Sequence, residues 1–207
     1  MLARQQIITA MTLDGFDDWF PDDLVELHRP RFRPDDLDGD GRTAAVLLLI
    51  YPDTQQVLRT VLTRRQARLN HHGGQISLPG GSQDPGESLR RTAEREANEE
   101  LGIDPTQLEI LGTLNTIYIP PSDFTVFPYV GWLDRRPQFR PADSEVAEVI
   151  EVPLGRLLDP ETRVTGKIQV ASGDHLDLPY YAIDHHQVWG ATALILSEFI
   201  ERLRRVI

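Results

Sequence analysis

The feature that most constrains this chain is a run of charged residues, R-E-x-x-E-E, formed by Arg95, Glu96, Glu99 and Glu100. A helix brings residues three and four apart onto one face, so Glu96 and Glu100 lie about 40° apart around the axis, and Glu99 lies about 60° from Glu96. Three carboxylates this close repel one another by roughly 3 kcal/mol per pair, for 5 Å and an effective dielectric near 20. A divalent cation would turn that repulsion into binding, and hard oxygen ligands favour Mg²⁺ or Mn²⁺.

The residues around this run predict a helix with defined ends. Its core-facing stripe has i, i+4 spacing and consists of Leu89, Ala93, Ala97 and Leu101. Asp84-Pro85-Gly86-Glu87 offers an N-cap, a proline at the first helical position and a glutamate at the third, which predicts a capping box. Gly102 suits a left-handed C-terminal stop. Because Glu96 and Glu100 flank the stripe, we expect them at the edge of the core, half shielded from water.

These residues resemble the Nudix box, G-x5-E-x7-R-E-U-x-E-E-x-G-U, in which U is apolar. The matching positions are Gly81, Glu87, Arg95, Glu96, Ala97, Glu99, Glu100, Gly102 and Ile103. Nudix proteins are mostly hydrolases that cleave a diphosphate linked to a nucleoside, using divalent metal bound on the box helix. The resemblance therefore implies a metal-dependent hydrolase with Mg²⁺ or Mn²⁺ as cofactor.

The segment just before the box is similar to the signature of the coenzyme A pyrophosphatase branch of that family, L-L-T-x-R-[SA]-x3-R-x3-G-x3-F-P-G-G. Agreement is found at Leu62, Thr63, Arg65, Gly74, Pro79, Gly80 and Gly81. The sequence departs from the signature at Gln66, Asn70 and Leu78. Residues 188–196 also resemble the W-G-x-T-A stretch that opens the last helix of that branch, so the likeness extends from about Thr43 onward.

The resemblance assigns the metal site to Glu96, Glu100 and Glu99, completed by a backbone carbonyl of Gly80 or Gly81, where glycine allows an ion to approach the backbone. Glu96 and Glu100 are the expected ligands, and Glu99 is either a ligand or the catalytic base.

Other residues are expected to assist the metal site. Arg95 precedes Glu99 by four positions and can pair with it, which holds that carboxylate in place. Glu87 is expected to orient the helix start or a metal-bound water. A remote acid often assists in this family, and Glu145 and Glu148 precede the segment where one is expected. The predicted catalytic set is therefore Glu99, Glu96, Arg95 and Glu145.

Charge indicates what kind of substrate the chain can bind. A net charge of −11 argues against nucleic acid polymers, because binding by counterion release needs a basic surface. A small anionic substrate needs a local positive patch, and the best candidate is the cluster of Arg64, Arg65 and Arg68. Asn70 and His72 lie beside these arginines and complete the predicted substrate-binding set.

Hydrophobic patterning predicts a mixed α/β fold, in keeping with the Nudix-type α/β/α sandwich that the resemblance implies. We expect a helix near the N-terminus and strands over 43–51, 56–63, 75–78, 108–119, 124–133 and 145–150. A turn is expected at Pro79-Gly80-Gly81, a hairpin over 163–183 around Ser172-Gly173, and a closing helix over 189–206 that packs on the core. Residues 1–42 are interpreted as an extension packed on a Nudix domain of residues 43–207.

Composition excludes several classes of protein. The chain has no cysteine, so disulfides, a thiolate nucleophile and cysteine-ligated zinc are excluded. The first residues are too weakly apolar for a signal peptide and no run is long enough to span a membrane, so we expect a cytoplasmic protein without a membrane partner. The pair His185-His186 suggests a metal site, but adjacent histidines do not easily face one ion and no third ligand follows at zinc spacing, so loop residues are expected.

Three functions remain open. The first is hydrolysis of coenzyme A or acyl-CoA to 3′,5′-ADP and 4′-phosphopantetheine or its acyl derivative, as the resemblance implies. The second is hydrolysis of another nucleoside diphosphate such as ADP-ribose, which Gln66 and Asn70 favour. The third is a non-catalytic module that binds nucleotides or a protein. The sequence leaves the oligomeric state open between a monomer and a homodimer.

Overall fold

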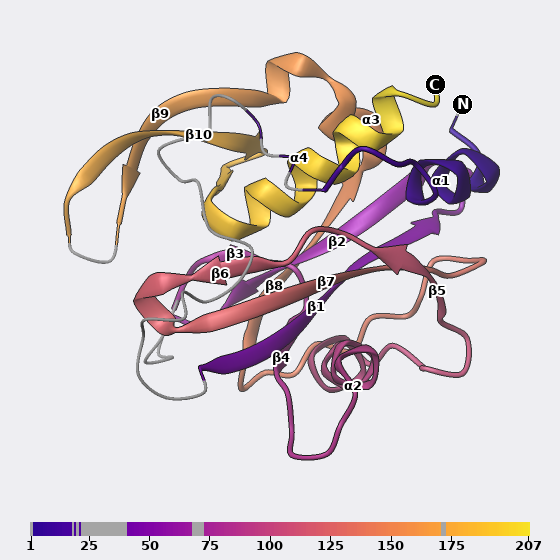
Figure 1. Ribbon diagram of the computed structural model, residues 1–207, viewed down its shortest axis with the longest axis horizontal. Coiled ribbons are helices and arrows are strands. Elements are labelled where there is room, and N and C mark those ends of the chain that lie inside the picture. Colours follow the sequence, from indigo (N-terminus) through magenta and orange to yellow (C-terminus); the bar gives the residue numbers. More distant parts are fainter. Residues whose placement is uncertain (1, 18, 20, 22–40, 68–72, 171–172) are drawn as a thin grey trace.

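The predicted α/β/α sandwich is confirmed by a computed structural model, which describes residues 2–17, 19, 21, 41–67, 73–170 and 173–207. A twisted mixed sheet forms the middle layer (Figure 1). Helix α2 (Leu89–Leu101) covers one face, and α1 (Arg4–Met11) and α4 (Gly190–Arg204) cover the other. Among the described residues, no helix is both long enough and apolar enough to cross a membrane.

The large sheet comprises eight of the described strands. They are β1 (Arg42–Pro52), β2 (Leu58–Arg65), β3 (Ile76–Ser77), β4 (Gly80–Ser82), β5 (Glu109–Thr113), β6 (Ile117–Ile119), β7 (Phe124–Trp132) and β8 (Val146–Pro153). A smaller sheet contains β9 (Arg163–Gln169), β10 (His175–Ile183) and β11 (His186–Val188). Two 3₁₀ turns, η2 (Pro120–Ser122) and η3 (Pro160–Thr162), and the short helix α3 (Leu154–Leu158) complete the description.

Strand β1 is the centre of the large sheet. Its run of alanine, valine, leucine and isoleucine is buried on both faces, as expected of a strand with helices above and below. It pairs in parallel with β7 along nine registered positions, from Arg42 with Phe124 to Ile50 with Trp132. On its other edge it pairs first with β4 and then with β2, so β1 holds the glycine strand β4 directly beside α2.

Alternation along β1 divides the core into two clusters. Leu47, Leu49 and Tyr51 pack on the α2 side with its stripe of small residues. Leu48 and Ile50 pack on the other side, against α1 and α4. This second cluster is the larger, and it includes the predicted core residues of the last helix, Leu194, Ile195, Phe199 and Leu203, all of which are buried. The prediction that this helix packs on the core is confirmed.

A buried polar network joins α4 to the N-terminal segment. Glu198 accepts hydrogen bonds from the Asn115 backbone N–H (2.8 Å) and from Arg202 Nε (2.9 Å). Arg202 also donates to the Leu13 carbonyl and lies over the Phe16 ring. Glu198 and Arg202 are both buried, so their charges compensate each other away from water.

The predicted elements are largely confirmed, with differences at the glycines. Pro79-Gly80-Gly81 was expected to be a turn, but Gly80 and Gly81 are in strand β4 and pair with Val46 and Ala45. Glycine can adopt an extended backbone conformation as well as a turn, and here pairing with β1 stabilises the extended form. The predicted strand over 108–119 is two strands, β5 and β6. The boundary between residues 42 and 43 stays a prediction.

We expect Glu198→Ala to lower the free energy of unfolding by about 3–5 kcal/mol, because it leaves Arg202 buried without its carboxylate. For a protein of this size that is a fall of roughly 10 °C in melting temperature. Glu201→Ala is the matched control, since Glu201 forms a partly exposed i, i+4 pair with Arg205 on the same helix. Calorimetry of the two variants tests this, and equal melting temperatures would contradict the role of the network.

Candidate metal and active site

Helix α2 begins later than the sequence predicted. Its N-cap is Ser88, whose hydroxyl accepts a hydrogen bond from the Arg91 N–H (3.3 Å). The predicted capping box at Asp84 to Glu87 is therefore wrong. Those residues form a preceding turn, in which the Glu87 N–H donates to the Asp84 carbonyl. The Glu87 carboxylate accepts hydrogen bonds from both the Asp84 N–H (3.4 Å) and Arg95 Nε (3.2 Å). The end at Gly102 is confirmed, with a left-handed φ of 71°.

The predicted apolar stripe of α2 is buried and fixes the rotation of the helix. Ala93, Ala97 and Leu101 are fully buried against β1. Because Ala93 and Ala97 are small, the helix axis can approach the sheet closely. Glu100 therefore lies deeper than the half-shielded position that the sequence predicted, with a side chain only 3% exposed.

Arg95 is the cation around which the glutamates of the box are arranged. Its guanidinium donates to Glu96 Oε1 (2.8 Å), Glu99 Oε2 (3.0 Å) and Glu87 Oε1 (3.2 Å), and also to the Ser82 carbonyl (2.9 Å). The predicted pair with Glu99 is thus present, and it is one of several. One charge shared among three carboxylates holds them in position but leaves net negative charge.

The two glycines of β4 lie directly against the carboxylates of α2. The Gly80 N–H donates to Glu100 Oε2 (3.3 Å). A Cβ added to Gly81 would lie 2.5 Å from Glu96 Oε1, and one added to Gly80 would lie 2.4 Å from the Ala45 carbonyl oxygen. Gly80 also has a φ of 157°, which side chains rarely adopt. Only glycine lets strand and glutamates come this close.

Burial perturbs the protonation of both inner glutamates. Desolvation raises the pKa of Glu100 to about 8, and Glu96 and Glu145 add to the rise, while Arg65 and the Gly80 N–H oppose it. Desolvation also raises the pKa of Glu96, against the lowering effect of Arg95. Carboxylates kept in a poorly solvated, negatively charged site are strongly attractive to a cation.

The outer predicted residues are arranged differently. Glu145 is exposed, yet its charge contributes to the raised pKa of both Glu96 and Glu100, so the structure brings it to the same site. Glu99 points outward, with a side chain 56% exposed. Its predicted role as ligand or base stays a prediction.

The predicted arginine cluster is divided by the sheet. Arg65 points toward α2, where Nη1 lies 3.5 Å from Glu100 Oε1. Arg64 binds Glu148 Oε2 on β8 (2.9 Å), and Glu148 in turn contacts His186 of the small sheet (3.2 Å). Consecutive residues of a strand point to opposite faces, so Arg64 and Arg65 do not form the single patch that was predicted. Arg68, Asn70 and His72 lie outside the described residues.

The described residues also contain a second group of metal-binding side chains, which sequence reasoning set aside. Potential ligand atoms of Glu148, His185 and His186 all lie within 4.8 Å of one another. The sequence argued that adjacent histidines do not easily face one ion, yet here both approach Glu148, because His185 lies in the tight β10–β11 turn, in which Asp184 has a φ of 52°, and so is outside strand alternation. The third ligand comes from β8 and has no sequence spacing that could reveal it.

Comparison with known proteins agrees with this arrangement. Residues 41–171 match the family model of the NUDIX domain. The chain is 35% identical to the uncharacterized Nudix hydrolase NudL of Citrobacter koseri, over 92% of this chain and 94% of that protein. It is 37% identical to NudL of an Enterobacter species, over 91% and 93%. The chain belongs to the Nudix family.

Solved structures support the same fold. The Nudix hydrolase RenU of M. smegmatis aligns with a TM-score of 0.52 at 23% identity, covering 79% of this chain and 84% of that one. The NUDIX domain of Shewanella oneidensis NrtR, solved with ADP ribose, aligns with a TM-score of 0.50 at 20% identity, covering 84% and 92%. At these identities the likeness is one of fold.

Membership of the Nudix family carries a general chemistry. Nudix hydrolases act on nucleoside diphosphate derivatives and generally use divalent metal ions, so the predicted hydrolase class is confirmed. The box of this Nudix protein is the segment from Gly81 to Ile103 described above.

Glu100→Gln is expected to change how stability depends on pH in the metal-free protein. The pKa of Glu100 is about 8 in the folded protein and 4.5 in an ordinary carboxyl, so the folded state holds its proton more tightly. The wild type therefore loses stability from Glu100 as pH rises from 4.5 through 8, by roughly 1.4 kcal/mol per pH unit, and the amide does not.

We compare the melting temperature of the variant minus that of the wild type, with a chelator present. This difference should be at least about 5 °C more positive at pH 9 than at pH 5. Thermal unfolding across this pH range makes the measurement. Parallel curves for the two proteins would contradict the buried, desolvated position of Glu100.

Proposed function

We propose that this protein is a Mg²⁺- or Mn²⁺-dependent hydrolase of the diphosphate bond of coenzyme A or acyl-CoA, giving 3′,5′-ADP and 4′-phosphopantetheine or its acyl derivative. The observation that carries the proposal is the pair Glu96 and Glu100, packed against Gly80 and Gly81 with raised pKa values. Burial of two like-charged carboxylates without a full counter-charge destabilises the fold, and such groups are typical of catalytic and metal-binding sites.

The donor set fits a hard divalent ion. The candidate ligand atoms are carboxylate oxygens of Glu96 and Glu100, with the backbone carbonyl of Gly81 as the predicted third ligand, all of the type that Mg²⁺ and Mn²⁺ prefer. A Cβ on Gly81 would lie against both oxygens of the Glu96 carboxylate, so glycine at this position keeps the carboxylate accessible. When bound, the ion supplies positive charge to the diphosphate and acidifies a water molecule.

The protein's own residues perform the positioning. Arg95 fixes Glu96 by a bond to Oε1, which leaves Oε2 free of that contact. The Gly80 N–H and Arg65 hold the two oxygens of Glu100. Arg65 is 26% exposed on its side chain, and a diphosphate can reach it from solvent. We assign Arg65 to binding the substrate phosphates, since guanidinium pairs well with phosphate oxygens.

Two carboxylates are candidates to accept the proton of the attacking water. Glu99 is exposed and held by one bond from Arg95, so it is accessible. Glu145 lies close enough to raise the pKa of both inner glutamates, and its side chain is exposed. We assign the base to Glu145 or Glu99, and the two single variants would separate them through their pH–rate profiles.

The choice of coenzyme A rests on the upstream segment, where seven fixed positions of the branch signature are present. The second candidate is ADP-ribose or a related nucleoside diphosphate, favoured by Gln66 and Asn70 at two departures from that signature. The fold relative NrtR was solved with ADP ribose. A non-catalytic binding module, the third candidate, has no use for two desolvated glutamates.

Location and assembly follow as part of the proposal. We expect the enzyme in the cytoplasm, as a monomer or a homodimer that binds neither membrane nor nucleic acid polymers.

Glu96→Gln and Glu100→Gln should each reduce metal-dependent turnover by at least about 100-fold, because each removes a charged ligand while keeping the shape of the side chain. Glu94→Gln is the matched control, as Glu94 is on the same helix and pairs with Arg90 outside the site. Turnover is measured with Mg²⁺ or Mn²⁺, and folding is checked by circular dichroism. Wild-type turnover in either site variant would refute the assignment.

A substrate screen separates the three candidates. Coenzyme A, ADP-ribose, NADH and dinucleoside polyphosphates are incubated with Mg²⁺ or Mn²⁺, and products are identified by mass. We expect coenzyme A to give 3′,5′-ADP and 4′-phosphopantetheine at a kcat/KM at least ten times that of ADP-ribose. The reverse ranking would establish the second candidate, and no hydrolysis of any compound would support the third.

A further inference from the structure

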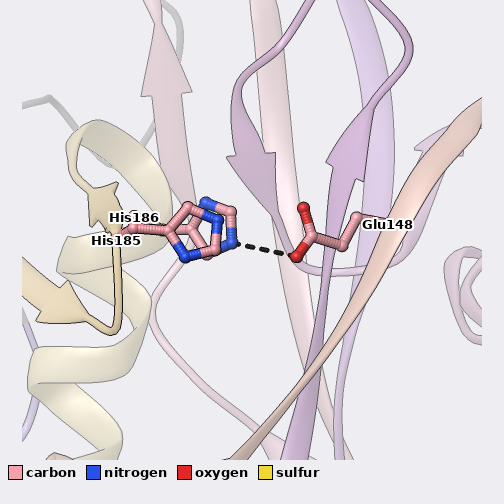
Figure 2. Close-up of side chains that lie close together, drawn as sticks. All are labelled: Glu148, His185 and His186. Carbon is pink, nitrogen blue, oxygen red and sulfur yellow. Dashed lines mark hydrogen bonds and ion pairs between the residues drawn. The ribbon is translucent and has the colours of Figure 1, made fainter.

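The second cluster of side chains, formed by Glu148, His185 and His186, lies away from the Nudix box. His185 lies in the turn between β10 and β11, His186 is the first residue of β11, and Glu148 comes from strand β8 (Figure 2). Helix α2 covers the opposite face of the large sheet (Figure 1). The cluster is therefore separate from the glutamates assigned to catalysis.

The geometry points to a binding site for a first-row transition metal of the Zn²⁺ type, with His185, His186 and Glu148 as its three protein ligands. Two imidazoles and one carboxylate form a mixed nitrogen and oxygen donor set, which suits Zn²⁺, Ni²⁺ or Cu²⁺ better than Mg²⁺. This inference does not depend on the proposed hydrolase activity.

The closest pair of ligand atoms already has the right separation. His186 Nε2 and Glu148 Oε1 are 3.2 Å apart. An ion about 2.05 Å from both atoms would be coordinated at an angle of roughly 103°, close to tetrahedral. The His186 side chain is only 8% exposed, so its ring is held in place by its surroundings.

His185 can complete the set with a small movement. Its ring lies beside that of His186, with centroids 3.9 Å apart, and both rings face Glu148 (Figure 2). All three ligand atoms lie within 4.8 Å, whereas tetrahedral coordination needs about 3.3 Å between them. His185 is exposed, so rotation of its side chain meets little resistance.

Arg64 adapts the carboxylate to this kind of ion. Its Nε binds Glu148 Oε2 at 2.9 Å and leaves Oε1 toward His186. Arg64 and His186 lower the pKa of Glu148, so the carboxylate stays ionised. Ligating carboxylates are commonly supported by such a hydrogen bond. Because Arg64 already pairs with the charge of Glu148, this carboxylate attracts a hard cation such as Mg²⁺ only weakly. The two imidazoles then determine which metal ion is preferred.

A bound ion would fasten the small sheet to the large one. Strand β11 leads directly into α4, and β8 pairs with β2 along seven registered positions. Coordination would add a strong link between these elements, so the ion is expected to raise the melting temperature, and the rise should increase with the logarithm of the free ion concentration above Kd.

The test uses the full-length chain without a histidine tag, dialysed against Zn²⁺ in excess Mg²⁺, followed by elemental analysis. His71→Gln and His72→Gln are introduced into every protein, so that this other histidine pair does not contribute. We expect one equivalent of Zn²⁺, with affinity reduced more than about 100-fold in His186→Gln, because even changes to groups that merely support ligands cost about 10–100-fold. His175→Gln is the matched control, since His175 is exposed on β10 outside the cluster, and it should bind as the parent does.

Two further readouts separate this site from the Nudix box. Co²⁺ in the parent should give the strong visible absorption of four-coordinate, nitrogen-bound cobalt, and the absorption should be lost in both His186→Gln and Glu148→Gln. Zn²⁺ should raise the melting temperature of the parent but not of His186→Gln. Equal Zn²⁺ binding by the parent and His186→Gln, or cobalt spectra that do not differ between them, would overturn the site. Loss of hydrolysis in the Glu96→Gln variant bears only on the proposed function.

Discussion

The close approach of the glycine strand β4 to helix α2 is the contact on which the candidate active site depends. It is possible only because β4 has no side chains at Gly80 and Gly81 and because α2 turns alanines toward β1. The same contact desolvates Glu100 and raises its pKa, so the packing of α2 on the sheet sets the electrostatics of the site. A bulkier stripe on α2 would move the helix outward and return these carboxylates to water.

Strands β2 and β8 give the two faces of the sheet different chemistry. Arg65 faces the glutamates of α2, and its neighbour Arg64 faces Glu148 and His186. One face carries an all-oxygen group of ligands, and the other carries imidazoles with a single carboxylate. Adjacent residues can therefore serve unrelated sites without interfering, because the hydrogen-bonded sheet lies between them.

The sequence predicted what depends on local spacing. The stripe of α2, its stop at Gly102 and the pairing of Arg95 with Glu99 all follow from helical periodicity, and each is present. The start of α2 was misjudged, because Ser88 is a second possible N-cap four residues after Asp84, and the partly buried Arg95 binds Glu87 in the turn before the helix.

Contacts between distant segments could not be predicted in the same way. The division of Arg64 from Arg65 required knowledge of which faces the sheet covers. The meeting of His185 and His186 with Glu148 required knowledge of how the small sheet lies against the large one. The burial of Glu100 depends on the pairing of β4 with β1. The sequence did not predict this pairing, because Gly80 and Gly81 were expected to form a turn.

The parallel pairing of β1 with β7 has a consequence for how the chain acquires its structure during synthesis. Arg42 cannot pair with Phe124 until the intervening residues, which include helix α2, have been synthesised. Until β7 emerges, the central strand lacks one neighbour, and the small apolar face of α2 rests on an unfinished sheet. Long-range pairing of this kind slows folding and leaves apolar edges open to other chains. A nascent chain arrested before β7 should therefore be a client for chaperones, and the larger core cluster is complete only after β8 and α4 have also been made.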